Sequence, residues 1–462
     1  MKQIIDNIEA FILIGPDESR PHWVSHFIVP TANELLVKVK TKEGIEGFGI
    51  CTVYADINPI INTIKSGFLE QIIGMDATSP EKIYDKIFGM TARKLSFEKK
   101  WSKETLIRIS AAIDIACWDI IGKFSNLPLY KLFGGYRDQV PCYVTCAYYR
   151  DGKDNIELRD EIKMLVEQGH KGFKGKIGGL SLKEDMERMA IVREIIGEDN
   201  DLMVDVNRAW DLKTAIQGAK ELKSLNPRWL EEPVKWSDDR RELKLLSQQT
   251  DIPLSGGESE ITIYGCRSIL EEQAIQILQF DCTMFGGFSG GKKLSALCEL
   301  NHVDIAPHHD CFIHAHIVAA SPSGLIVESF TDPERDPLQA ELFENPPKIE
   351  NGILYINKEP GLGLKLFQPI VSSLIEDLIT TDKKFFPKNC PNNNIKAIIK
   401  ETTVGLILIK KSLSKNNVRP PNKTTAKQPN AANIGIFLKK YQDIINAIIV
   451  LITRTAVPAK IP

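Results

Sequence analysis

The stretch "GFKGKIGGLSLKEDMERMAIVREIIGEDNDLMVDVN", residues 172–207, decides how this chain folds. It begins with a short apolar run, continues as "SLKEDMERMAIVREIIG", an amphipathic stretch typical of a helix, and ends in a second apolar run. A short strand, a helix and another short strand in succession are the repeating unit of a parallel sheet. We therefore predict one strand–helix–strand unit over residues 172–207.

The same alternation continues in both directions from this unit. Between about residues 136 and 351 it predicts about eight strands separated by helices, which is the pattern of a parallel β/α barrel. The apolar runs that we interpret as strands are 140–149, 172–178, 202–207, 228–233, 252–258, 274–281, 303–309 and 324–330.

The segments on either side of this region differ from it. Residues 1–135 begin with strand-like alternation and end in long helical patterns, and 352–368 returns to strand and turn chemistry that we expect to pack on that first domain. Residues 370–462 hold 15 basic and 5 acidic residues and are rich in Asn, Lys and Pro. We predict that they are a poorly ordered extension, or a frameshifted or read-through end.

The composition is that of an ordinary globular protein. Of 462 residues, 43% are hydrophobic and 26% are charged, with a net charge of −2. The acidic balance before residue 370 argues against nucleic-acid binding, and no apolar run is long enough for a membrane helix or a signal peptide. Nine scattered cysteines without a CxxC pair predict reduced, buried thiols in a cytoplasmic protein.

Ionisable residues stand at the ends of the predicted strands. In a β/α barrel these ends meet at one mouth, where active sites are built, so residues far apart in sequence are expected to converge. Each step along the series is 20 to 29 residues, about one strand–helix unit. The series is Lys176, Asp205, Glu231, Glu258, Asp281, His308 and Glu328.

Three of these residues suggest a metal site. Asp205, Glu231 and Glu258 follow three successive strands, and three neighbouring carboxylates repel one another unless a cation joins them. Oxygen ligands select a hard divalent ion, and Mg²⁺ keeps coordination positions open for water and substrate. Adjacent strand residues face opposite ways, so only one of Glu231 and Glu232 can be a ligand, and we choose Glu231.

The remaining residues suggest proton transfer. A carboxylate on one imidazole nitrogen fixes the tautomer and raises the basicity of the other, so His308 with Asp281 is a candidate general acid or base. Lys174 and Lys176 share one strand face, and the charge of Lys174 is expected to lower the pKa of Lys176, which would make Lys176 a base. Glu328 is a candidate proton donor if burial keeps it protonated.

With these residues in place, the chain resembles the mandelate racemase subgroup of the enolase superfamily over about residues 1–368. The resemblance rests on "AAIDIACWDIIGK", "FKGKIG", "DVN", "WLEEP", "GGES", "LQFD", "APHHD" and "IVE". It implies an α+β capping domain over a modified (β/α)7β TIM-type barrel. It also implies Mg²⁺ on the three carboxylates, a lysine base at Lys176 with Lys174 as its partner, a histidine base at His308 paired with Asp281, and an electrophilic acid at Glu328.

The resemblance implies abstraction of the α-proton of a carboxylate substrate through an enediolate. We favour dehydration of a sugar acid, an aldonate or aldarate, to a 2-keto-3-deoxy acid. The alternatives are a racemase, epimerase or cycloisomerase on the same scaffold, or an inactive product with an aberrant C-terminal tail. A small-molecule carboxylate is the expected partner, and a homo-oligomer the expected assembly. Candidate substrate contacts are Asn207, Tyr148, Arg20, His22 and Tyr54.

Overall fold

The computed structural model describes residues 2–14, 20–30, 32–336, 338 and 342–367, together with the strand 406–410. The chain divides into two units, Met1–Ser412 and Leu413–Pro462, and the second lies outside the described residues. The prediction that residues 370–462 are poorly ordered therefore concerns residues that the structure does not describe, apart from the strand 406–410.

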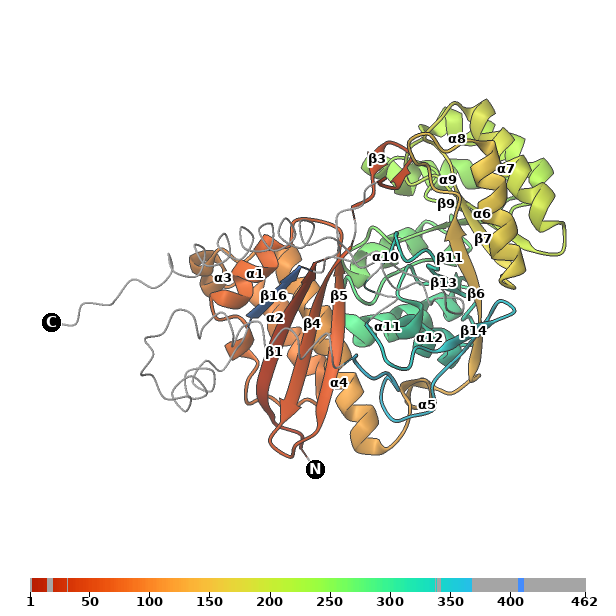
Figure 1. The fold of residues 1–462 in the computed structure, drawn as a ribbon. Helices are drawn as coiled ribbons and strands as arrows, with labels where there is room; N and C mark the ends of the chain where they lie inside the picture. The colour runs from red at the N-terminus through yellow and green to blue at the C-terminus, as the bar shows by residue number, and fades with distance from the viewer. Residues whose placement is uncertain are drawn as a thin grey trace, which may run out of the picture. The chain divides into compact units, whose positions relative to one another are not determined.

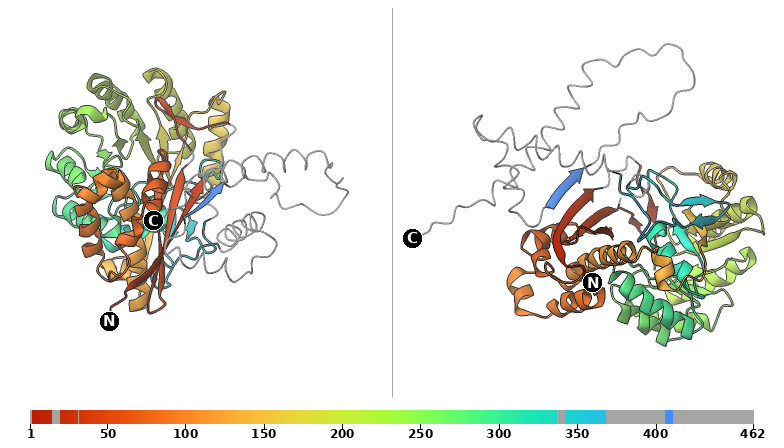
Figure 2. Two further views of the ribbon diagram at one scale, coloured as in Figure 1. Left: turned by 90° about the vertical axis from the view of Figure 1, so that its left-hand side faces the viewer. Right: turned by 90° about the horizontal axis from the view of Figure 1, so that it is seen from below.

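The N-terminal sheet is built from three antiparallel strands, the first two of which are separated in sequence by a short hairpin. They are β1 (Ile5–Ile14), β4 (Asn33–Thr41) and β5 (Glu46–Val53), and β16 (Leu406–Lys410) runs parallel to β1 at the edge. Figures 1 and 2 show these four strands side by side. A short hairpin, β2 (Trp23–Val24) and β3 (Phe27–Ile28), stands apart from this sheet.

Helices follow the sheet in sequence, and the longest packs closely against it. That helix is α4 (Lys103–Ser125), which begins at the N-cap Ser102 and ends at Asn126 in the left-handed conformation. A Cβ on Gly49 of β5 would lie 2.1 Å from the carbonyl oxygen of Ala112, so only glycine lets helix and strand approach this closely. The other elements of this domain are α1 (Asn58–Lys65), η1 (Leu69–Gln71), α2 (Pro80–Met90), α3 (Lys94–Lys99) and α5 (Leu129–Phe133).

The described chain then forms a barrel of eight parallel strands joined by seven helices, which confirms the (β/α)7β architecture (Figure 1). The strands are β6 (Gln139–Cys146), β7 (Gly172–Lys176), β8 (Asp201–Asp205), β9 (Leu230–Glu231), β10 (Leu254–Gly256), β11 (Ile277–Leu278), β12 (Asp304–Ile305) and β13 (Val327–Ser329). The helices are α6 (Asn155–Glu167), α7 (Leu182–Ile196), α8 (Leu212–Leu222), α9 (Asp239–Ser247), α10 (Ile263–Glu271), α11 (Gly287–Leu300) and α12 (Cys311–Ala320), with short turns η2 (Lys223–Leu225) and η3 (Trp236–Asp238).

The ring of strands closes where the last strand meets the first. Neighbouring strands pair in parallel from β6 to β12, and β13 pairs with β6. The remaining seam, between β12 and β13, is held by a bridge from Ile305 to Gly324. Because every strand runs the same way, all eight carboxyl ends face one mouth, as the sequence predicts.

The opening stretch of sequence folds as predicted into β7, α7 and β8. Helix α7 begins with a capping box, in which the Ser181 hydroxyl accepts from the Glu184 N–H while the Glu184 carboxylate accepts from the Ser181 N–H. This cap fixes the turn that separates the strand end at Lys176 from the helix.

The segment after the barrel contacts both domains. Strands β14 (Lys348–Glu350) and β15 (Ile353–Tyr355) form a hairpin, and β15 pairs with β6 of the barrel. Further on, the backbone of Gly361 exchanges hydrogen bonds with Leu127 and Leu129, at the end of α4 and the start of α5. The segment therefore first adds the strand β15 to the barrel sheet and only then, at Gly361, contacts the first domain.

One carboxylate of the first domain caps a helix of the barrel. Helix α11 has Gly286 at its N-cap and so no side-chain cap of its own. Asp114 of α4 takes that place, because its Oδ1 accepts the N–H of Ser289 at 3.0 Å. Asp114 is buried, and its Oδ2 has no hydrogen-bond partner in the described chain. Burial therefore raises the pKa of Asp114 to about 7, although the hydrogen bonds from Ser289 oppose the shift.

The eight cysteines in the described residues are buried free thiols. In the part of the chain that the structure describes, no helix is long and apolar enough to cross a membrane.

Candidate active site at the barrel mouth

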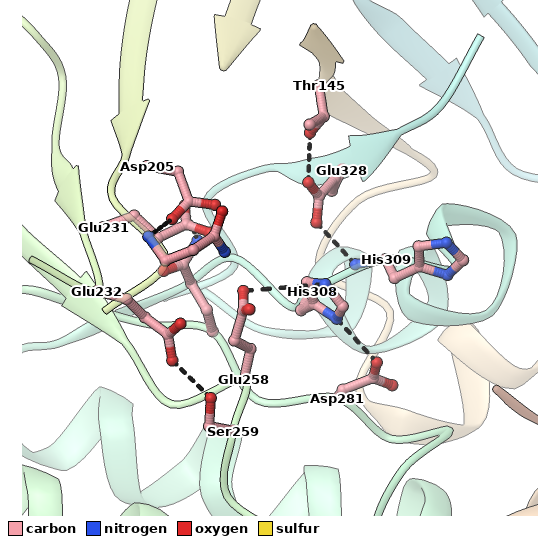
Figure 3. Close-up of polar contacts among 12 residues, drawn as sticks. Thr145, Asp205, Glu231, Glu232, Glu258, Ser259, Asp281, His308, His309 and Glu328 are labelled. Carbon is pink, nitrogen blue, oxygen red and sulfur yellow. Dashed lines mark hydrogen bonds and ion pairs between the residues drawn. The ribbon is translucent and has the colours of Figure 1, made fainter. Parts of the chain in front are cut away.

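Three carboxylates gather at the ends of successive barrel strands. Asp205 ends β8, Glu231 ends β9, and Glu258 lies two residues beyond β10. Each offers one oxygen, and these three oxygens lie within 4.8 Å of one another. Figure 3 shows Asp205 and Glu231 next to each other, with Glu258 between them and His308.

This cluster fits a hard divalent cation. All its donors are carboxylate oxygens, and Glu258 Oε2 is buried without a hydrogen-bond partner in the described chain. Burial and the charge of Asp205 raise the pKa of Glu231 to about 8, so nearby positive charge is needed to keep the cluster fully ionised.

The neighbouring Glu232 stands outside the cluster. Its backbone has a φ of +38°, and its carboxylate accepts from the Ser259 hydroxyl at 2.7 Å and lies 3.1 Å from Arg208 Nε. Only one of the two adjacent glutamates joins the cluster, as predicted, but Glu232 lies one residue beyond β9 and is turned away by its left-handed backbone rather than by strand alternation.

The two lysines of β7 both reach the carboxylates. Lys174 Nζ lies 2.6 Å from Glu231 Oε1 and 2.8 Å from Glu328 Oε1, and the side chain is fully buried. Lys176 donates to Asp205 Oδ2, and its Nζ lies 5.5 Å from the ring centroid of Tyr148. Lys174 thus contacts both Glu231 of the carboxylate cluster and Glu328, and Lys176 lies nearer the mouth than Lys174.

Lys174 lowers the pKa of Lys176 as predicted, but the predicted net lowering is wrong, because nearby carboxylates act more strongly in the other direction. Burial is the largest influence on Lys176 and lowers its pKa, and the charge of Lys174 lowers it a little further. The attraction of Asp205, with smaller contributions from Tyr148 and Glu231, outweighs both, so this pKa lies above its ordinary value. The like charge two residues away is a minor influence because each ammonium group is neutralised by its own carboxylate.

A histidine approaches the cluster from the other side of the barrel. His308 Nδ1 lies 3.1 Å from Asp281 Oδ2, and Nε2 lies 3.8 Å from Glu258 Oε2 (Figure 3). Burial opposes protonation, but Glu258, the hydrogen bond with Asp281 and Glu328 together raise the pKa of His308 to about 9. Thr283 donates its N–H and hydroxyl to Asp281 Oδ1, which holds the carboxylate in place.

Glu328 is ionised rather than protonated. Burial alone would raise its pKa, but the attraction of Lys174, with smaller contributions from His308 and Lys176, brings the pKa well below the usual range. The carboxylate also accepts from the Thr145 hydroxyl and from the His309 N–H at 2.8 Å (Figure 3). The expectation of a protonated Glu328 is therefore wrong, because the sequence did not show that Lys174 reaches it.

Four of the five predicted substrate contacts lie near these groups. Asn207 donates its N–H to Asp205 Oδ1 at 2.8 Å, and its side-chain oxygen is buried without a partner in the described chain. The ring centroid of Tyr54 is 6.4 Å from that of His308. His22 packs edge-on against Tyr148, with ring centroids 5.2 Å apart.

Arg20 does not join this group. Its guanidinium donates to both oxygens of Glu157 at 2.7 and 2.9 Å, and to the carbonyl of Asp151 at 2.8 Å. These partners lie on α6 and the loop before it, so Arg20 ties the loop to the barrel rather than reaching the carboxylates.

Sequence reasoning missed Arg335 and Asp336, which lie in the loop after β13. Asp336 Oδ2 lies 2.5 Å from His309 Nε2, and the guanidinium of Arg335 lies 5.4 Å from the ring centroid of Tyr148. The run "TDPERDPL" has the composition of a solvated loop, and only its place directly after a barrel strand marks it as part of the mouth.

Comparison with known proteins agrees with this architecture. Residues 7–134 match the mandelate racemase / muconate lactonizing enzyme N-terminal domain, and residues 157–369 match the enolase C-terminal domain-like family. The chain belongs to the mandelate racemase/muconate lactonizing enzyme family. This assignment confirms the resemblance seen in the sequence.

Relatives within the mandelate racemase/muconate lactonizing enzyme family carry out different reactions. The arabinonate dehydratase of Saccharolobus solfataricus is 30% identical over 332 residues, which are 71% of this chain and 86% of that protein. The N-succinyl-L-Arg/Lys racemase of Bacillus cereus is 26% identical over 372 residues, covering 77% of this chain and 93% of that protein. A crystal structure of an L-talarate/galactarate dehydratase variant liganded with Mg and L-glucarate superposes with a TM-score of 0.72 at 25% identity, over 80% of this chain and 92% of the other.

Proposed function

We propose that this protein is a Mg²⁺-dependent enzyme that removes the proton next to the carboxylate of a sugar acid and then expels a hydroxyl group as water. The observation that carries the proposal is the position of Lys176 and His308 on either side of the carboxylate cluster. Lys176 on β7 contacts Asp205, and His308 after β12 approaches Glu258. The strands β8, β9 and β10 that supply the cluster lie between them.

Asp205, Glu231 and Glu258 would hold Mg²⁺. When bound, the ion supplies positive charge beside the substrate carboxylate, which acidifies the α-proton and stabilises the enediolate left by its removal. A substrate whose α-carbon lies between Lys176 and His308 then has a nitrogen on each face.

The two nitrogens are assigned different roles. The hydrogen bond between His308 Nδ1 and Asp281 favours the protonated ring and raises its pKa, which suits His308 to protonate a leaving β-hydroxyl through Nε2. Lys176 is assigned as the base. It can accept a proton only in its neutral form, so its contact with Asp205 must weaken in the working enzyme.

The overall dehydration is balanced without a redox partner. The base takes the α-proton, the acid gives a proton to the β-hydroxyl, and water leaves. The resulting enol becomes a 2-keto-3-deoxy acid when the carbon that lost the hydroxyl takes up a proton.

Unpartnered polar groups near the site support a hydroxyl-rich substrate. The Tyr54 hydroxyl and Asn207 Oδ1 are buried, and each lacks a hydrogen-bond partner in the described chain. Leaving a buried polar group unpaired is costly, so such groups in a mouth are suited to a ligand that brings its own donors and acceptors. The kinship with an arabinonate dehydratase points the same way.

A racemase or epimerase is the second candidate. It is favoured by the same pair of nitrogens on opposite faces and by the kinship with a racemase. A racemase uses both groups as bases on one carbon and releases no water.

Incubation with Mg²⁺ and a library of sugar acids tests both candidates. Dehydration gives 2-keto-3-deoxy acids, which are detected as semicarbazones. If the products are instead epimers that carry solvent deuterium at the α-carbon, and no water is lost, the protein is a racemase or epimerase and not a dehydratase. If no acid is dehydrated and none exchanges its α-proton, both proposals fail. The same assays on a chain that ends at Phe367 test whether the extension spoils activity.

A further inference from the structure

A buried guanidinium without a carboxylate partner lies beside the proposed site. Arg335 is 4% exposed, and its Nε and Nη1 have no hydrogen-bond partner in the described chain. Its guanidinium carbon lies 5.4, 5.5 and 5.8 Å from the ring centroids of Tyr148, Phe330 and Tyr54. Three aromatic rings surround this cation, and among the described residues it forms no ion pair.

The two acids next to Arg335 along the chain are matched to other groups. Asp336 Oδ2 lies 2.5 Å from His309 Nε2, and Glu334 Oε2 accepts from Arg150 Nη2 at 2.8 Å. His309 thus uses the carboxylate that would otherwise neutralise Arg335. Aromatic faces stabilise a cation in part, but they accept no directed hydrogen bonds from its Nε and Nη1.

The rings that flank Arg335 also flank the two groups assigned to proton transfer. The centroid of Tyr148 is 5.5 Å from Lys176 Nζ, and that of Tyr54 is 6.4 Å from the His308 ring. The Tyr54 hydroxyl is likewise buried without a partner in the described chain. One wall of the mouth therefore carries a guanidinium with two unpartnered nitrogens and an unpartnered hydroxyl, next to rings that contact the reacting nitrogens.

We propose that Arg335 binds the second, distal carboxylate of a dicarboxylic sugar acid, and so selects aldarates over aldonates. This inference rests on the proposed function and specifies its substrate class. The planar guanidinium presents paired N–H groups that match a carboxylate, and such bonds are among the stronger ones in a water-poor site. An aldonate has an uncharged hydroxymethyl group in that position, so with an aldonate bound Arg335 stays an unneutralised buried cation.

The test compares matched aldarates and aldonates, of equal chain length and configuration, on wild type, Arg335→Gln and Arg335→Lys with Mg²⁺. We expect Arg335→Gln to lower kcat/KM on the aldarate by about 10- to 100-fold. On the matched aldonate, kcat/KM should change by less than about 3-fold. Arg335→Lys should show a smaller loss, because lysine keeps the positive charge but lacks the paired N–H groups of the guanidinium. Arg159→Gln, which removes an exposed arginine paired with Glu194 on α7, is the control and should change neither value.

Thermal unfolding separates this role from a merely structural one. Without ligand, Arg335→Gln should be at least as stable as wild type, because an unneutralised buried charge is removed. Added aldarate should raise the melting temperature of wild type more than that of the variant. A large drop in stability without ligand, or equal losses on both acids, would assign Arg335 to packing and overturn the proposal.

Two outcomes with the wild-type protein separate this inference from the function on which it rests. If wild type dehydrates or epimerises aldonates but no aldarate, the proposed function stands and the role of Arg335 is refuted. If it exchanges the α-proton of neither class, the proposed function fails and this inference fails with it.

Discussion

Asparagine in place of Asp114 should remove a large pH dependence from the stability of this protein. Asp114 is buried between α4 and α11, and burial raises its pKa to about 7, against about 3.8 for the exposed group in the unfolded chain. Between those two values the folded protein holds a proton that the unfolded chain has lost. The contribution of Asp114 to stability is therefore complete below pH 3.8 and is lost as the pH rises through 7.

The size of the effect follows from the shift. Each pH unit well inside the window is worth about 1.36 kcal/mol, and the slope halves as the pH reaches the folded pKa. Raising the pH from 5 to 7 should therefore cost wild type ~2.3 kcal/mol through this one group. Asparagine keeps an oxygen that can accept the Ser289 N–H at the start of α11, but it does not titrate. The free energy of unfolding of Asp114→Asn, minus that of wild type, should rise by that amount over the same interval.

Urea denaturation at pH 5, 6, 7 and 8 measures this difference, since other titrating groups cancel between the two proteins. Asp85→Asn, which changes an exposed acid on α2, is the control and should run parallel to wild type. Parallel curves for Asp114→Asn and wild type over this range would refute the reasoning, because they would mean that Asp114 is not buried as a neutral acid.

Three further predictions concern the site and the core. Lys176→Ala should lower kcat by about 10²- to 10⁴-fold while calorimetry still detects Mg²⁺ binding, and full turnover would remove Lys176 from the mechanism. Glu258→Gln should weaken Mg²⁺ binding by more than about 10-fold, and chelation should abolish turnover reversibly; unchanged affinity would exclude Glu258 as a ligand. His316, buried on α12 beside the Leu362 carbonyl, has its pKa lowered to about 4 by burial, so its contribution to stability should be complete above pH 6.5 and fall by about 2 kcal/mol between pH 7 and 5. The free energy of unfolding of His316→Gln, minus that of wild type, should rise by that amount between pH 7 and 5, and parallel curves in urea denaturation would contradict the assignment.

The arrangement of the barrel could be predicted from sequence because it depends on period alone. Apolar runs of strand length alternate with amphipathic runs of helix length, and residues at the strand ends must then meet at one mouth. Asp205, Glu231, Glu258 and His308 are found together for that reason. The two-residue period of a strand shows that only one of Glu231 and Glu232 can join the cluster, but it does not show which one.

The charge states could not be predicted in the same way. Whether Lys176 and Glu328 carry a charge depends on competing interactions that are decided by a few tenths of an ångström, and the sequence gives no such distances. Spacing along β7 shows that Lys174 and Lys176 share a face. It does not show that Lys174 reaches across the barrel to Glu328, 2.8 Å away.

Loop residues were the other difficulty. Arg20 and Arg335 both lie in polar loops, but only Arg20 was among the candidate substrate contacts. Arg20 donates hydrogen bonds to Glu157, whereas Arg335 is buried among aromatic rings. A loop has no period from which a side-chain direction can be inferred, so only tertiary contacts separate the two arginines.

The salt bridge from Lys174 to Glu328 also ties folding to completion of the ring. Lys174 lies on the second barrel strand and Glu328 on the eighth, so the pair can form only when β13 docks on β6. A partly assembled barrel would leave a lysine inside without one of its two close counter-ions, which is strongly unfavourable. We therefore expect intermediates that lack β13 to remain hydrated around Lys174 and to exchange the amide hydrogens of β7 readily. Strong protection of β7 before β13 docks, in pulsed hydrogen exchange during refolding, would show that the interior closes without this pair.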